Sequence, residues 1–123
     1  MTERLNILGV KVDTKNMSEA VDYLLDSLDS DGVTSVFTPN SEIILAAYKD
    51  PAYRDVLNRA SLVTPDGIGV VYASKILGNP LPERVSGFDL ANELLKSCAP
   101  LGKTLYLFGG KPEIAESAAE KIK

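Results

Sequence analysis

Short β-rich runs alternate along this chain with segments of helical periodicity, and this alternation constrains the fold more than any other feature. The runs are residues 33–37, 61–64 and 104–110, the last being the clearest strand candidate. Each precedes a polar or glycine-containing loop and then a helix-forming segment. This order is typical of an α/β domain with a largely parallel sheet and helices on both faces. We therefore expect a single Rossmann-like α/β domain over residues 1–123.

Local signals predict where the helices begin and end. Asn16 followed by Glu19 matches a capping box, and Asp50 matches the cap of a helix that opens with a proline. Gly78 is a typical residue just beyond a helix end. The predicted helices cover residues 17–28, 41–49, 51–60, 68–77, 88–98 and 112–123. The last of them reaches Lys123 without a stop signal, so we expect the domain to be truncated at its C-terminus.

Composition narrows the chemistry available to the chain. Thirteen basic residues against seventeen acidic ones give a net charge of −4, which argues against broad electrostatic binding of nucleic acid or anionic lipid. With no histidine, the chain can build no Ser–His or Cys–His pair and no histidine metal site. The single cysteine, Cys98, excludes an internal disulfide. Acid–base chemistry therefore falls to Asp, Glu, Lys, Tyr or that cysteine.

One carboxylate stands where a predicted strand gives way to a predicted helix. In LVTPDGIGVVYAS, residues 62–74, Asp66 follows Pro65 and precedes Gly67. Asp66 has two candidate roles: capping the next helix or an Asx-turn, and accepting a proton from a substrate hydroxyl. From spacing alone the capping role is favoured, and an acid fully occupied by capping would be a poor base.

Two further loops carry polar groups suited to binding a sugar or a phosphate. FTPNSEI offers Thr38, Asn40 and Ser41, which could recognise a sugar or cap the next helix, and the cap is favoured. PERVSGFDL offers Arg84, which has two candidate roles. It could bind phosphate oxygens, or it could form a surface ion pair with Glu83 or another acid.

A Gly-Gly turn in FGGKPE, residues 108–113, lies between a predicted strand and a predicted helix. Glycines allow a ligand to approach the backbone, and a helix N-terminus favours an anion. A plain tight turn explains the same residues equally well.

Together and in this order, the motifs TPNSEI, TPDGIGVV, ERVSGFDL and LYLFGGKPEIAESAA resemble the WecG/TagA/CpsF glycosyltransferase family, most closely its TagA type. They span about positions 38 to 119. The resemblance implies inverting transfer of N-acetylmannosamine from UDP-N-acetylmannosamine to undecaprenyl-diphosphate-N-acetylglucosamine, in synthesis of the wall teichoic acid linkage unit. It implies no required metal ion and no other cofactor.

The resemblance also assigns roles to individual residues. Asp66 corresponds to the general base. This role, implied by the resemblance, outweighs the capping role that spacing alone favours. The implied substrate-binding residues are Thr38 and Asn40 around the sugar, Arg84 at the diphosphate, Ser86 in the same loop, and Phe108, Gly109 and Gly110 against the nucleotide.

The family's longer C-terminal part implies further donor contacts and docking to the inner face of the bacterial cell membrane as a peripheral protein. Two alternatives stay open at this point: a transferase of the same family with another UDP-sugar donor, and a non-catalytic nucleotide-binding α/β module. The oligomeric state, monomer or homo-oligomer, also stays open.

Overall fold

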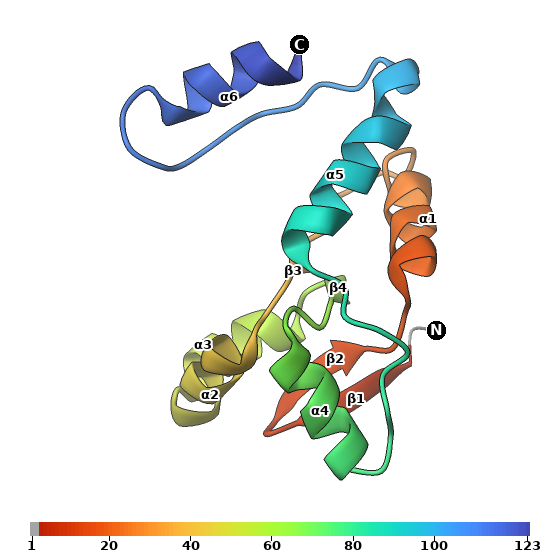
Figure 1. The fold of residues 1–123 in the computed structure, drawn as a ribbon, viewed down its shortest axis with the longest axis vertical. Helices are drawn as coiled ribbons and strands as arrows, with labels where there is room; N and C mark the ends of the chain where they lie inside the picture. The colour runs from red at the N-terminus through yellow and green to blue at the C-terminus, as the bar shows by residue number, and fades with distance from the viewer. Residues whose placement is uncertain (1–2) are drawn as a thin grey trace.

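The computed structural model describes residues 3–123 as a mixed α/β chain (Figure 1). Its elements are β1 (Arg4–Ile7), β2 (Val10–Asp13), α1 (Met17–Ser27), β3 (Val36–Phe37), α2 (Ser41–Lys49), α3 (Pro51–Asn58), β4 (Leu62–Val63), α4 (Ile68–Ile76), α5 (Gly87–Cys98), the 3₁₀ turn η1 (Ala99–Leu101) and α6 (Ile114–Ile122). The predicted mixture of strands and helices is confirmed. Among these residues, no helix is both long and apolar enough to cross a bilayer.

The helix starts follow the local signals of the sequence. The Asn16 side chain accepts from the Glu19 backbone N–H at 2.8 Å, and the Asn16 N–H donates to the Glu19 carboxylate at 3.0 Å, which confirms the capping box. Asp50 caps α3 through bonds from the next helical N–H groups. Gly78 follows the end of α4 with φ +84°, a conformation that favours glycine.

The strands form two separate pairs. β1 and β2 pair antiparallel as a hairpin, whereas β3 and β4 pair in parallel with Val36 opposite Leu62 and Phe37 opposite Val63. Helices α2 and α3 lie between β3 and β4 in the chain, so this part is a βαβ crossover. The largely parallel sheet expected from the sequence is present in residues 3–123 only as this pair.

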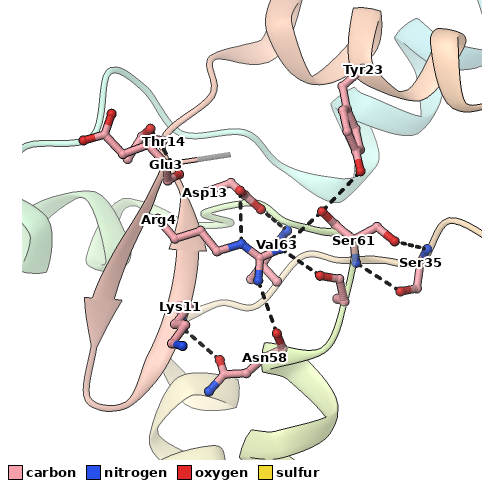
Figure 2. A network of polar contacts seen from close by, with 11 residues as sticks. Glu3, Arg4, Lys11, Asp13, Thr14, Tyr23, Ser35, Asn58, Ser61 and Val63 are labelled. Carbon is pink, nitrogen blue, oxygen red and sulfur yellow. Dashed lines mark hydrogen bonds and ion pairs between the residues drawn. The ribbon is translucent and has the colours of Figure 1, made fainter. Parts of the chain in front are cut away.

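A buried carboxylate ties the hairpin to the parallel pair (Figure 2). Asp13 is 1% exposed, and its Oδ2 accepts from the Val63 backbone N–H at 2.6 Å. Its Oδ1 pairs with the Arg4 guanidinium at 3.3 Å. Arg4 also donates to the backbone carbonyls of Asn58, Ala60 and Ser61. One ion pair therefore joins the hairpin, the end of α3 and β4.

The core has two apolar clusters that share β4. Val63 packs with hairpin residues and with α2 and α4, whereas Leu62 packs with Ala20, Leu24, Val85 and Leu90 of the α1 and α5 side. This division follows from the two-residue period of a strand, which sends successive side chains to opposite faces. β4 is thus buried on both faces, and its carboxyl end is fixed within the chain.

The strand predicted over 104–110 is wrong for this chain. These residues form no strand and make no backbone hydrogen bond, and Tyr106 is 83% and Phe108 92% exposed. A β-rich composition favours extended backbone, but a strand also needs a neighbour for its N–H and C=O groups. Within residues 3–123 no strand lies beside this segment, which leads away from the core toward α6 (Figure 1).

The last helix also begins later than predicted. Pro112 lies in a turn, and α6 starts at Ile114 because Glu113 takes a left-handed φ of +75° that interrupts helical geometry.

Replacing Asp13 by alanine should lower the free energy of unfolding by about 3 kcal/mol, because it leaves the Val63 N–H and the Arg4 charge without their partner. Urea denaturation measures this difference. Asp22→Ala, which removes an exposed acid of α1, should change stability by less than about 0.5 kcal/mol. Equal effects of the two substitutions would contradict the role given to Asp13.

The backbone of residues 103–110 should show no protection in hydrogen–deuterium exchange, whereas the amides of Leu62 and Thr64, bonded to the Ser35 and Phe37 carbonyls, should be protected. Mass spectrometry of this chain separates the two segments. Protection within residues 103–110 comparable to that of β4 would contradict the finding that this segment forms no strand.

Candidate functional site

Three loops meet at the carboxyl ends of β3 and β4. The Thr64 N–H donates to the Phe37 carbonyl at 2.9 Å, and the Asp66 N–H donates to the Pro39 carbonyl at 3.2 Å. The Val85 N–H then donates to the Pro65 carbonyl at 2.8 Å, which adds the loop before α5. The TPN, TPDG and RVSG motifs, distant in sequence, are therefore held side by side by backbone bonds.

Each loop ends where a helix begins. Asn40 is the N-cap of α2, Gly67 of α4 and Ser86 of α5. Helix N-termini carry partial positive charge and N–H groups that can bind an anion. The carboxyl ends of the parallel strands thus present three helix starts together, which is where α/β proteins commonly bind ligands.

Asp66 lies at the centre of this convergence and does not cap α4. Its helix neighbour Gly67 serves as the α4 N-cap with φ +101° and without a side-chain bond. The Asp66 side chain is 29% exposed; its Oδ2 accepts from the Gly87 N–H at 3.2 Å. The capping role that spacing alone favours is therefore wrong for α4. A carboxylate can accept about four hydrogen bonds, so Asp66 keeps room to accept a proton from a ligand.

Arg84 is brought to the same carboxylate. Its Nη2 lies 3.8 Å from Asp66 Oδ1, and its side chain is 55% exposed. Of the alternative ion pairs, the one with Glu83 is not seen, and the Glu83 carboxylate accepts from the Met17 N–H at 2.8 Å, whereas the one with another acid is seen, with Asp66. An exposed ion pair at this distance contributes little to stability, so the guanidinium stays available to an anionic ligand.

Two of the predicted binding residues serve as helix caps. Asn40 Oδ1 accepts from the Ile43 N–H at 2.9 Å, which confirms the capping interpretation of this loop. The Asn40 amide nitrogen takes no part in that cap. Ser86 is 4% exposed, and its hydroxyl accepts from the Asp89 N–H at 3.1 Å. Ser86 therefore anchors the start of α5 rather than facing solvent.

Two residues of the site, Gly87 and Thr64, were not singled out by the sequence. A Cβ on Gly87 would lie 2.7 Å from Thr38 Oγ1, so this position admits only a glycine without movement. Thr64, 1% exposed and two positions before Asp66, has a side-chain oxygen without a hydrogen-bond partner among the described residues. The contact of Gly87 with Thr38 joins distant segments, and the burial of Thr64 results from tertiary packing, neither of which periodicity and local motifs reveal.

Phe108, Gly109 and Gly110 are not brought to Asp66 in this structure. They belong to the exposed segment that leads away to α6 (Figure 1), and both glycines take positive φ, +108° and +82°. The glycines are explained locally by this backbone. The predicted contact of these residues with a nucleotide stays a prediction.

Nothing in residues 3–123 gathers three or more His, Cys, Asp or Glu side chains in a way that could hold a metal ion. The polar groups near Asp66 are instead an arginine, hydroxyls, an amide and backbone N–H groups. This set suits an anionic, hydroxyl-rich ligand.

The fold and the site define an α/β protein whose loops cluster beyond its parallel strands, the position where α/β proteins commonly bind ligands. The chain belongs to the glycosyl transferase WecG/TagA/CpsF family, whose sequence model matches residues 5–123.

Curated relatives carry the name N-acetylglucosaminyldiphosphoundecaprenol N-acetyl-beta-D-mannosaminyltransferase. The one from Bacillus subtilis (strain 168) is 36% identical over 108 residues, which cover 87% of this chain and 42% of that protein. The one from Staphylococcus aureus (strain NCTC 8325 / PS 47) is 34% identical over 119 residues, 95% of this chain and 47% of that protein. The chain thus spans less than half the length of these relatives.

Asn40→Ala should lower the free energy of unfolding by about 1 kcal/mol, because α2 loses its N-cap. Asn40→Asp keeps an oxygen for the Ile43 N–H and should stay near the original stability. Thermal denaturation of the original chain and both variants measures the difference. Equal stability of all three proteins would contradict the role of Asn40 as a helix cap.

Proposed function

We propose that this chain carries the catalytic carboxylate of a glycosyltransferase that moves N-acetylmannosamine from UDP-N-acetylmannosamine to undecaprenyl-diphosphate-N-acetylglucosamine. The supporting observation is the position of Asp66, partly exposed where three loops of a glycosyl transferase family member converge, beside Arg84. The names of the relatives supply the sugar and the acceptor. The UDP donor and the place in wall teichoic acid linkage-unit synthesis come from the resemblance of the motifs.

The chemistry needs a base on the acceptor side of the sugar. The acceptor hydroxyl oxygen attacks the anomeric carbon, the bond from that carbon to the UDP oxygen breaks, and UDP leaves with the electron pair. The hydroxyl proton passes to the Asp66 carboxylate as the new bond forms, and attack opposite the leaving group inverts the anomeric configuration. In a chain without histidine, a carboxylate suits this task.

The neighbours of Asp66 fit the remaining roles. Arg84 and the helix N-termini can stabilise the negative charge that grows on the departing diphosphate without a metal ion. We assign sugar binding to Thr38 and to the Asn40 amide nitrogen, which the α2 cap does not use, and Ser86 caps the start of α5.

The relatives are longer than the part that this chain covers. We propose that an enzyme of that length has a Rossmann-like α/β fold and that its nucleotide contacts Phe108, Gly109 and Gly110, as the resemblance of the motifs implies. A C-terminal segment would dock the protein to the inner face of the bacterial cell membrane, where its lipid-linked acceptor lies.

In a chain of family length that includes these residues, Asp66→Asn should lower kcat for sugar transfer by about 10² to 10⁴-fold, because the amide cannot take the acceptor proton. A radiolabel transfer assay with UDP-N-acetylmannosamine and a short-chain lipid-diphosphate acceptor measures this. The matched control is Asp55→Asn on the exposed face of α3, which should keep the original rate. An Asp66→Asn variant as active as the control removes Asp66 from the mechanism.

The same assay separates the alternatives. Transfer from UDP-N-acetylmannosaminuronic acid or UDP-glucose, but not from UDP-N-acetylmannosamine, would select another donor within the family. UDP binding by calorimetry that is unchanged in Asp66→Asn, with no transfer from any UDP-sugar, would select a non-catalytic nucleotide-binding module.

A further inference from the structure

Gly87 touches both the proposed base and a proposed sugar-binding residue. Its N–H donates to Asp66 Oδ2 at 3.2 Å, and the space where its Cβ would lie is occupied by Thr38, with Oγ1 at 2.7 Å and the Thr38 Cβ and Cγ2 at 3.2 Å. Gly87, the first residue of α5, therefore packs closely against the loop after β3 and donates a hydrogen bond to the loop after β4.

Several contacts hold the start of α5 in place, so a shift that made room for a side chain would disturb them. The Val85 N–H is bonded to the Pro65 carbonyl at 2.8 Å, and Val85 is fully buried. Ser86 caps the helix through Asp89, and Leu90 lies in the core cluster shared with α1. Each of these contacts fixes the distance between the Gly87 backbone and the Asp66 carboxylate.

The bond to Gly87 also sets which oxygen of Asp66 is available. Oδ2 is engaged by the Gly87 N–H, whereas Oδ1 faces Arg84 across 3.8 Å. A carboxylate that turned freely about its terminal torsion would lose a defined direction for accepting a proton.

We propose that Gly87 is a positioning residue for transfer: lacking a side chain, it lets α5 approach Thr38 closely enough for its N–H to hold Asp66 Oδ2, which leaves Oδ1, on the side of Arg84, as the oxygen that accepts the proton. This inference rests on the proposed function of Asp66. It adds that the orientation of the base depends on a backbone group of a different loop, 21 positions further along the chain.

Helix propensity and position in the site give opposite expectations for Gly87→Ala. Gly87 has no positive φ, and alanine is the better helix former, so propensity alone predicts an unchanged or more stable protein. The clash with Thr38 instead predicts that α5 shifts and the bond to Asp66 is lost. Displacement of a catalytic group by about 1 Å can cost about 100-fold in rate.

The test uses a chain of family length and the transfer assay with UDP-N-acetylmannosamine. Gly87→Ala should lower kcat at least about tenfold while KM for the UDP-sugar changes by less than about threefold, since the altered contact is to the base. Ala91→Gly, on the exposed side of the same helix, lowers helix propensity without touching the loops and should leave kcat within about twofold. A Gly87→Ala enzyme with kcat within about twofold of the original would overturn the proposal.

If Gly87→Ala alone fails to fold, a double variant still tests the proposal. Thr38→Ala removes Oγ1, which makes the shortest contact with a new Cβ, and Cγ2, and keeps only the Thr38 Cβ at 3.2 Å, so Gly87→Ala in that background should leave kcat near that of Thr38→Ala alone. A further tenfold loss in the double variant would contradict the steric argument.

Failure of the proposed function would be visible separately. An original chain with no transfer from any UDP-sugar defeats the glycosyltransferase proposal whatever the variants do. The contact itself is then checked by NMR, because Asp66→Asn should move the Gly87 amide resonance if the two groups are bonded, and an unmoved resonance would refute the contact.

Discussion

The Asp13 carboxylate is the interaction on which the arrangement of this chain depends. β4 has only two paired residues, and a strand so short cannot hold its place through its ladder alone. Asp13 bonds the Val63 N–H on the edge that β3 does not use, and Arg4 joins the same carboxylate to the end of α3 (Figure 2). Separating the hairpin from β4 would leave the buried Asp13 charge without these partners, which is unfavourable in free energy. This cost holds the hairpin and β4 together.

This attachment has a direct consequence for the site. Because β4 is fixed, so are Pro65 and Asp66 beyond its carboxyl end, and Pro65 is buried. The loops after β3 and before α5 then bond to this fixed segment through the Pro39 and Pro65 carbonyls. The position of Asp66 is therefore a product of backbone bonds among three loops, with Arg84 and Gly87 adding contacts to its side chain.

The features that sequence predicts well are those decided within a few residues. The capping box at Asn16 and the caps at Asn40 and Asp50 need only neighbouring N–H groups, and all three are present. Asp66 could be singled out because a carboxylate followed by glycine after a β-rich run is a local pattern. Its bond to Gly87 could not, since that contact joins segments 21 positions apart. The prediction of a strand at 104–110 was wrong for the same reason. The composition of this segment favours extended backbone, but a strand also needs a neighbouring strand to pair with, and that depends on tertiary structure.

We propose that Asp66 faces the reacting sugar while Arg84 binds the diphosphate. A crystal structure of a chain of family length with UDP bound would reveal both contacts. We expect diphosphate oxygens within hydrogen-bond distance of the Arg84 guanidinium, and Asp66 Oδ1 left open to the acceptor. UDP bound away from the three loops, or an Asp66 carboxylate covered by the additional chain, would contradict it.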